Sequence, residues 1–281
     1  MKDNQSITSR TNPKVKELLE LKESKDYFFV EGYRIIDEIL NADFHPQELI
    51  FTPKAESNPI TPKAKSMSSN YTALSEQVFT KLSDTKEPQG LAAFFKKQSY
   101  EIKDLLKKSG KNRLFLLLHE IQDPGNLGTI FRTARASGVS GILLTNRSVS
   151  VTNTKVVRAS MGSVFTVPFV DNIDLNNAIS YLKNSHISIA ATDANLGKDL
   201  FKTDYTLPIC FVFGSEAHGL PDDVFKKADF VLKIPMINKI ESLNLSVSAA
   251  ILMYDAVQKY KWIIKMYHWS KEARLITITL S

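Results

Sequence analysis

The stretch that decides the fold is LFLLLHEIQDPGNLGTIFRTARASGVSGILLT, residues 114–145. Two short apolar runs, 114–118 and 141–145, enclose a polar turn and a segment with helical character, 126–137. Continuous apolar runs of this length are typical of strands that are buried on both faces of a parallel sheet. The stretch therefore predicts a strand, a turn, a helix and a second strand of one such sheet.

The same alternation continues toward the C-terminus and predicts an α/β domain over residues 114–265 with a mostly parallel sheet. We expect further strands at 163–169, 187–193, 210–214 and 230–235, and helices at 175–184, 221–227 and 242–260. The last helix has an amphipathic stripe that favours a core or interface role over chemistry, formed by Leu243, Val247, Ala250, Tyr254 and Val257.

Residues 1–98 predict a smaller α/β domain with some parallel pairing. We expect one helix that begins at Pro13 and another at 33–42. Strands are expected at 27–32, 48–52 and 90–97, and residues 53–69 are predicted to form a loop or a short helix. The polar, lysine-rich residues 99–113 are interpreted as a linker. The tail, 266–281, has no obvious place in the sheet.

Composition indicates a globular protein of the cytoplasm. The chain has 281 residues, of which 43% are hydrophobic and 23% charged. No apolar run approaches the roughly 18 residues of a membrane span, and the polar N-terminus lacks the apolar core of a signal peptide. The single cysteine, Cys210, excludes an internal disulfide. We therefore expect a reduced, cytoplasmic location and no membrane association.

Positive charge is concentrated in the C-terminal part. The net charge is +6, and residues 1–110 carry 17 Lys and Arg against 16 Asp and Glu, whereas residues 111–281 carry 19 against 14. An excess of this kind suits a surface that binds a polyanion. A basic protein with no such partner remains an equal alternative on charge alone.

Three segments combine a strand end with a polar turn, which is where ligands bind in open α/β sheets. In the first, 119–138, Asn126 can cap the following helix, and Arg132 and Arg135 are three residues apart and share one helix face. The alternative is an ordinary solvated helix face with a capping asparagine.

The other two segments are 211–221 and 234–251. In the second segment a tight turn at Gly214 presents Glu216, which can hold a substrate hydroxyl or be a plain exposed acid. In the third, Ser242 and Asn244 lie at the mouth of the last helix, where free N–H groups favour ligand binding, although Ser242 can equally be a simple N-cap.

Several common site signatures are absent from the sequence. It contains no G-x-G-x-x-G fingerprint after a strand, no phosphate-binding P-loop and no G-x-S-x-G elbow. The five histidines and the cysteine lack the spacing of metal ligands, so we expect no metal. The missing fingerprint also argues against a nucleotide-dependent dehydrogenase.

Taken in order, the three segments resemble the motifs of the SpoU–TrmH family of RNA ribose methyltransferases, in the SPOUT class, over residues 114–262. Asn126 and Arg132 in PGNLGTIFR match the first motif, Glu216 in FGSEAHGL the second, and Ser242 and Asn244 in ESLNLSVSAA the third. Residues 27–97 resemble, less specifically, the ribosomal-protein-like RNA-binding domain often attached to these enzymes.

The resemblance implies a C-terminal trefoil knot, which general folding rules would not suggest, and a homodimer formed through the knotted domain. It also implies S-adenosyl-L-methionine as cofactor, held in the knot loops near Gly214, Ile234 and Leu243, with Thr145 as a further candidate.

The implied reaction is methyl transfer to a ribose 2′-hydroxyl of structured RNA, with 23S ribosomal RNA favoured and transfer RNA as the alternative. The implied catalytic residues are Arg132, Asn126, Glu216, Ser242 and Asn244. Because arginine stays protonated at neutral pH, we favour a role for Arg132 in binding the adjacent phosphate and stabilising the oxyanion. The proton can then pass to water or to a transiently neutral guanidinium.

Two further expectations stand beside this assignment. Arg135 is a candidate RNA phosphate contact on our own reasoning. Asn238 in IPMIN replaces the glycine that the family usually has, and asparagine is the residue that best tolerates positive φ. A non-catalytic RNA-binding protein of ribosome assembly with the same fold is the alternative from another functional class.

Overall fold

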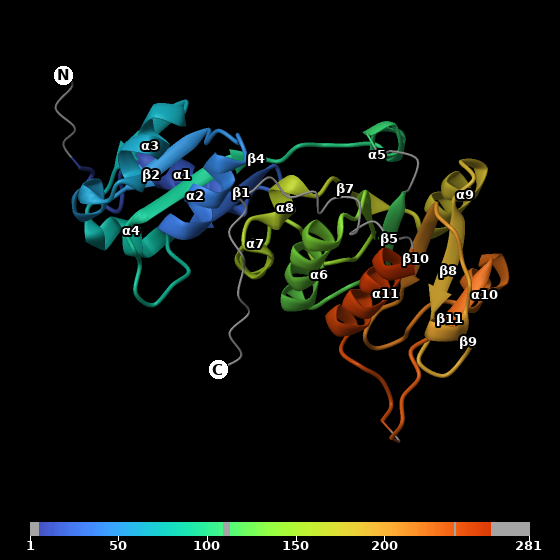
Figure 1. The fold of residues 1–281 in the computed structure, drawn as a ribbon. Coiled ribbons are helices and arrows are strands. Elements are labelled where there is room, and N and C mark those ends of the chain that lie inside the picture. Colours follow the sequence, from blue (N-terminus) through green and yellow to red (C-terminus); the bar gives the residue numbers. More distant parts are fainter. Residues whose placement is uncertain (1–5, 109–112, 239, 260–281) are drawn as a thin grey trace, which may run out of the picture.

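The computed structural model describes residues 6–108, 113–238 and 240–259, so the predicted tail, 266–281, lies outside the described part. A small N-terminal α/β domain lies beside a larger C-terminal one (Figure 1). Within the described ranges no helix is long and apolar enough to cross a bilayer.

The C-terminal domain is built on a seven-stranded sheet in the order β7-β6-β5-β10-β8-β11-β9, and every neighbouring pair is parallel. β10 lies between β5 and β8, so the chain reverses its direction of travel across the sheet at this point. In open α/β sheets ligands bind outside the carboxyl ends of the strands at such a reversal. The strands are β5 (Leu114–Leu118), β6 (Gly141–Thr145), β7 (Phe169–Ile173), β8 (Ser188–Thr192), β9 (Lys198–Asp199), β10 (Ile209–Phe213) and β11 (Phe230–Lys233).

Helices cover both faces of this sheet, and each face has its own apolar core. One face packs against α6 (Pro124–Ser137), α7 (Thr154–Ser160), α8 (Ser163–Thr166) and α11 (Leu245–Lys259). The other packs against α5 (Ile102–Lys108), α9 (Leu175–Asn184) and α10 (Asp222–Lys227). Burial on both faces explains why β5, β6 and β10 are continuous, fully buried runs that are almost entirely apolar. The predicted parallel α/β architecture is confirmed.

The N-terminal domain has a four-stranded sheet in the order β1-β4-β2-β3, in which β2 and β3 are parallel and β4 is antiparallel to both of its neighbours. The strands are β1 (Tyr27–Glu31), β2 (Glu48–Phe51), β3 (Asn70–Ala73) and β4 (Leu91–Lys96). The helical segments are α1 (Pro13–Glu23), α2 (Tyr33–Asn41), η1 (Pro53–Ser57), α3 (Ile60–Met67) and α4 (Glu76–Leu82). The expected parallel pairing is present, but between β2 and β3.

The strand predicted at 163–169 is wrong. Gly162, in a left-handed conformation at φ 82°, begins the short helix α8, and β7 starts only at Phe169. A short apolar run does not by itself distinguish a strand from a buried helix. The sequence reasoning also missed β3, α4, α7 and the two-residue strand β9.

The segment interpreted as a linker contains α5, which packs on the C-terminal sheet. Leu105 is fully buried, and a Cβ on Gly141 would lie 3.0 Å from its Cδ1 atom. The absence of a side chain at the start of β6 therefore makes room for this leucine. α5 belongs physically to the C-terminal core.

The two domains share an apolar contact that is flanked by ion pairs. The Phe165 ring lies 4.6 Å from that of Phe28 and 5.2 Å from that of Phe95, measured between centroids. Lys97 pairs with Asp171 at 3.0 Å beside this contact. Aromatic pairs of this geometry stabilise a junction beyond the area they bury, so the domains pack as one body.

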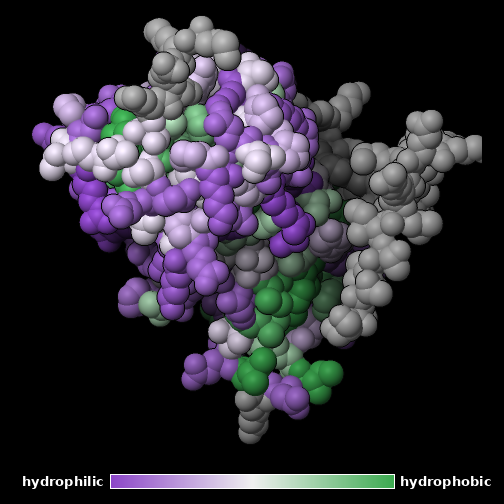
Figure 2. All heavy atoms as spheres, turned by 90° about the vertical axis from the view of Figure 1, so that its left-hand side faces the viewer, coloured by the Kyte–Doolittle hydropathy of each residue, from purple (hydrophilic) through white to green (hydrophobic). Residues whose placement is uncertain are grey.

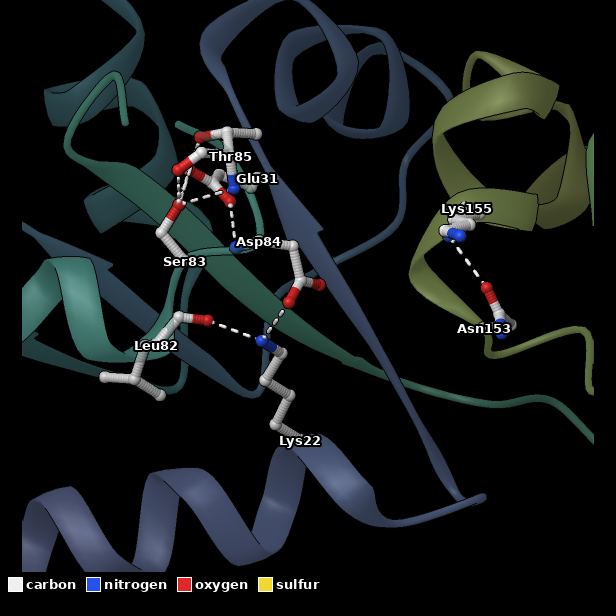
Figure 3. A network of polar contacts seen from close by, with 8 residues as sticks. All are labelled: Lys22, Glu31, Leu82, Ser83, Asp84, Thr85, Asn153 and Lys155. Atoms are coloured by element: carbon white, nitrogen blue, oxygen red, sulfur yellow. Dashed lines mark hydrogen bonds and ion pairs between the residues drawn. The ribbon is translucent and has the colours of Figure 1, made fainter. Parts of the chain in front are cut away.

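A polar network also holds the loop after α4 against α1 and β1 (Figure 3). Lys22 Nζ donates to Leu82 O at 2.6 Å and pairs with Asp84 Oδ1 at 2.6 Å. Burial opposes ionisation of Asp84, but hydrogen bonds from Lys22 and from Thr154 of α7 outweigh it and lower the pKa of this carboxyl group. The loop is thus tied to both domains.

The amphipathic stripe predicted for the last helix is only partly buried. α11 buries Ala249, Leu252, Met253, Ala256 and Val257, whereas Val247 and Tyr254 are 47% and 46% exposed. The two exposed residues are therefore not core in this chain. An interface role for them stays a prediction.

Candidate active site

A cavity of about 390 Å³ opens at the carboxyl edge of the C-terminal sheet. Its walls come from three separated parts of the chain, 192–194 after β8, 213–219 after β10, and 232–248 from β11 into α11, together with Asn126 of α6. The volume lies within the range of small-molecule pockets. Two of the three segments singled out from the sequence thus form most of the walls, and the first contributes Asn126.

Asn126 is the point at which the three predicted segments meet. Its Nδ2 atom donates to Glu216 Oε1 at 3.0 Å, and its Oδ1 atom accepts from Asn244 Nδ2 at 2.9 Å. Asn126 is 8% exposed, whereas Glu216 and Asn244 are exposed. We call these three residues the amide junction. The junction fixes the orientation of the Asn126 amide, because only this orientation donates to a carboxylate and accepts from an amide.

The helix caps differ from those expected at two positions. Asp123, not Asn126, caps α6, because its Oδ1 atom accepts from Asn126 N at 2.6 Å. Asn244, not Ser242, caps α11, accepting from Ser246 N at 2.9 Å. The plain capping roles considered for Asn126 and Ser242 are therefore wrong. The side chain of Asn126 is left available for the junction.

The turn that presents Glu216 depends on a close approach of the backbone to itself. Ser215 and Gly219 exchange backbone hydrogen bonds of 3.2 and 2.9 Å. A Cβ on Gly214 would lie 2.1 Å from the carbonyl carbon of Gly219 and 2.5 Å from Leu220 N. No side chain fits there, so glycine at 214 is required by packing.

The cavity is acidic at its rim and apolar in its depth. Asp193 and Glu216 line it, and no lysine or arginine does so among the described lining residues. Phe213, Leu232 and Leu252 supply apolar wall. Such a pocket favours a small molecule that carries positive charge beside an apolar body.

Segment 192–194 was missed by the sequence reasoning. Asp193 follows β8, and its Oδ1 atom accepts backbone N–H groups of Asn195 and Leu196, both at 2.7 Å. The signal was present in ISIAATD, an apolar run that ends in two polar residues. Because β8 is parallel to β10, its polar end reaches the same edge of the sheet.

Three of the four expected cofactor contacts line the cavity, namely Gly214, Ile234 and Leu243, as does Ser242. Thr145 does not. It is 3% exposed, and its Oγ1 atom accepts from Glu120 N at 3.0 Å and lies 3.1 Å from His119 Nδ1. In this structure Thr145 anchors the loop that follows β5.

The two arginines of α6 lie outside the cavity lining. Arg132 is exposed and has no hydrogen-bond or ion-pair partner among the described residues. Arg135 pairs with Glu38 of the N-terminal domain at 2.7 Å, where both side chains are well exposed. The structure thus brings Asn126, Glu216, Ser242 and Asn244 together and leaves both arginines on the neighbouring surface.

The structure also bears on the conformation of Asn238 and on clusters of side chains that could bind a metal. The described non-glycine residues with positive φ do not include Asn238, so the left-handed conformation considered for it is wrong. Within the described ranges, no group of three or more His, Cys, Asp or Glu is placed to hold a metal ion.

Comparison with known proteins identifies the family. Residues 113–254 match the family model of the SpoU rRNA methylase family. The chain belongs to this family. Residues 12–93 match the model of the MRM3-like substrate binding domain. The two matches follow the two domains of the structure.

Curated relatives of this SpoU family member agree with that assignment. An uncharacterized tRNA/rRNA methyltransferase of Synechocystis sp. is 31% identical over 264 residues, which is 92% of this chain and 94% of the relative. A putative TrmH family tRNA/rRNA methyltransferase of Bacillus subtilis is 36% identical over 62% of this chain and 72% of its own length.

Solved structures share the fold over most of the chain. The AdoMet-bound rRNA methyltransferase of Sinorhizobium meliloti is 27% identical, with a TM-score of 0.79 over 90% of this chain and 97% of its own. The structure of an RNA 2′-O ribose methyltransferase is also 27% identical, with a TM-score of 0.74 over 92% of this chain and 100% of its own.

Proposed function

We propose that this SpoU family member methylates a ribose 2′-hydroxyl of structured RNA, with S-adenosyl-L-methionine as methyl donor and large-subunit ribosomal RNA as substrate. The observation that carries the proposal is the amide junction of Asn126, Glu216 and Asn244, which joins the three motif loops beside one cavity. The solved RNA 2′-O ribose methyltransferase supports the choice of the hydroxyl. Transfer RNA is the alternative substrate, since relatives carry both designations.

The cavity fits the proposed donor. When bound, S-adenosyl-L-methionine supplies an electrophilic methyl group on a positively charged sulfur. The carboxylates of Asp193 and Glu216 match that positive charge, and the apolar wall suits the adenine ring. Gly214, Ile234 and Leu243 would hold the donor, as the AdoMet-bound neighbour of similar fold also suggests.

Residues of the chain have separate tasks in this proposal. Glu216 and Asn126 hold the ribose at the edge of the cavity, and Asn244 fixes Asn126 while Ser242 shapes the donor pocket. Arg132, exposed just past the middle of α6, binds the phosphate beside the target and stabilises the negative charge that develops on the 2′-oxygen. The hydroxyl proton would pass to water as the 2′-oxygen takes the methyl group, and S-adenosyl-L-homocysteine would be left as the second product.

The remaining parts of the chain complete the proposal. Residues 1–98 bind the RNA substrate, 99–113 connect the domains, and 114–265 form the methyltransferase domain with a trefoil knot through the loops around the cavity. Arg135 contacts RNA only after its pair with Glu38 opens. A cytoplasmic location stays a prediction from the sequence.

We further propose that the chain works as a homodimer. Ile237 and Ile240 of the loop before α11 are 102% and 51% exposed, and Val247 and Tyr254 of α11 are also exposed. Figure 2 shows hydrophobic residues gathered at the lower end of the molecule, where this loop projects. Exposed apolar surface of this extent is typical of a protein interface.

The experiment that tests the proposal is to map ribose methylation in total RNA from cells with and without the gene. We expect one 2′-O-methyl site in ribosomal RNA to be lost. Complementation with Arg132→Ala should leave the site unmethylated, and calorimetry should give S-adenosyl-L-methionine affinity close to that of the wild type. An unchanged methylation map in the deletion strain, or no cofactor binding by the purified protein, would overturn it.

A further inference from the structure

The loops after β5 and β6, residues 119–122 and 146–149, form one unit, which we call the paired loops. Val149 N donates to Ile121 O at 2.7 Å. Each loop leaves the carboxyl end of its strand, and the strands are neighbours in the sheet. The paired loops therefore stand at the same edge of the sheet as the cavity, on the side of β5 away from β8.

Two residues of the paired loops adopt a conformation that side chains rarely take. Glu120 has φ 52° and Arg147 has φ 65°, and neither is glycine, asparagine or aspartate. Conformations of this kind persist only where the surrounding contacts impose them, and they often mark functional positions.

Gln122 supplies those contacts and links them to the amide junction. Its Nε2 atom donates to Glu120 O at 3.2 Å and to Arg147 O at 2.5 Å. Its backbone N–H donates to Glu216 Oε2 at 3.4 Å. One side chain therefore clamps both strained residues, and its own backbone contacts the carboxylate that lines the cavity.

The clamp presents the guanidinium of Arg147 to solvent. Its side chain is 80% exposed, and the ion pair that it makes, with Glu120 Oε1, is long at 3.4 Å. Arg147 follows β6, whereas most of the cavity wall follows β10, β8 and β11, on the other side of β5 in the strand order. A ribose held at the junction would thus have the methyl donor on one side and this cation on the other.

We infer that Arg147 binds a backbone phosphate of the RNA next to the target ribose, and that Gln122 is a positioning residue that aims Arg147. The inference rests on the proposed function and extends it to a contact that the motif comparison does not assign. A guanidinium binds phosphate oxygens through paired N–H donors, which an exposed and weakly paired arginine can do without losing a buried contact. Glu120 partly neutralises Arg147 until the RNA takes its place.

The experiment compares Arg147→Asn with Lys202→Asn. Asparagine tolerates positive φ, so the first change removes the charge and keeps the loop. Lys202 is a matched control at the opposite edge of the sheet, 85% exposed and 3.8 Å from Asp199. The binding probes are ribosomal RNA and transfer RNA purified from cells that lack the gene, measured between 50 and 200 mM salt.

We expect Arg147→Asn to bind the substrate RNA about tenfold more weakly at 50 mM salt and about threefold more weakly at 200 mM, because one phosphate contact changes the logarithmic salt slope by about 0.7 to 0.9. Lys202→Asn should match the wild type. Calorimetric affinity for S-adenosyl-L-methionine should be unchanged in both. A salt slope for Arg147→Asn equal to that of the wild type overturns the inference.

A double-variant cycle tests the role of Gln122. Gln122→Met keeps nearly the size of the side chain and adds no charge but removes the two donated hydrogen bonds, so it should weaken RNA binding in the same direction. Combined with Arg147→Asn it should add no further change in salt slope, because Gln122 acts through Arg147. Additive effects would remove its positioning role. Binding slopes need no methyl transfer, so a wild type that methylates no RNA refutes the proposed function separately.

Discussion

Replacing Asn126 tests whether the amide junction holds the site together. Asn126→Ala removes one hydrogen bond to a carboxylate, at 3.0 Å, and one to an amide, at 2.9 Å. Because Glu216 and Asn244 are exposed and can be resolvated, we expect the loss to be about 2 kcal/mol in the free energy of unfolding. At about 2–4 °C per kcal/mol for a chain of this size, Tm should fall by about 4–8 °C.

Asn126→Asp sharpens the test. It has nearly the shape of asparagine, but it faces the Glu216 carboxylate with a second negative charge and has no N–H to donate. Like charges about 4 Å apart repel by about 1 kcal/mol in water and by more where solvent is partly excluded. The aspartate variant should therefore be less stable than the alanine variant.

The assay pairs thermal unfolding with single-turnover methylation of the mapped RNA. Both variants should transfer methyl groups about 100-fold more slowly, because a misplaced ribose loses its alignment with the donor. Asn184→Ala, an exposed change on α9 at the opposite face of the sheet, is the control and should match the wild type. An aspartate variant as stable and as active as the wild type would refute the reasoning.

Three other predictions concern backbone packing, pH and thiol reactivity. Gly214→Ala should abolish binding of S-adenosyl-L-methionine in calorimetry, because its Cβ would lie 2.1 Å from backbone; normal affinity would contradict the required glycine. Burial lowers the pKa of His119 below its usual 6.5, so the folded state favours the neutral ring. Stability that is present above pH 6.5 should therefore decline as the pH falls below it, more in the wild type than in His119→Gln; equal declines in Tm between pH 7.5 and 5.5 would exclude this cause. Burial also raises the pKa of the Cys210 thiol, so a thiol reagent should modify the protein only after unfolding, and rapid labelling of the native protein would contradict its burial.

Most of the methyltransferase sheet could be predicted from local pattern. β5, β6, β8 and β10 are apolar runs because both faces of each strand are covered, and residue type reflects burial of this kind directly. β11 was also predicted, although it is half-buried apart from Leu232. Segment 163–169 failed because its first residues form the short helix α8, in which Phe165 packs on Phe28 of the N-terminal domain. The local sequence does not indicate which distant part of the protein an apolar side chain will contact.

At the site, the sequence predicted the residues of the amide junction but not the hydrogen bonds between them. Turn signals and motif resemblance singled out Asn126, Glu216 and Asn244. The capping roles considered for Asn126 and Ser242 were wrong, because Asp123 and Asn244 cap the two helices. Asp193 was overlooked although β8 ends in polar residues. Only the order of parallel strands places that end beside Gly214.

The sequence by itself determined most strands and helices of the methyltransferase domain and two of the loops that carry polar chemistry, because burial and turn preference are properties of neighbouring residues. The tertiary structure decided that β10 lies between β5 and β8, that three loops meet at one asparagine, and that Arg147 lies on the side of β5 away from the strands that border the cavity. These are contacts between residues about 20 to 120 positions apart in the chain, and their geometry depends on how the whole sheet is ordered.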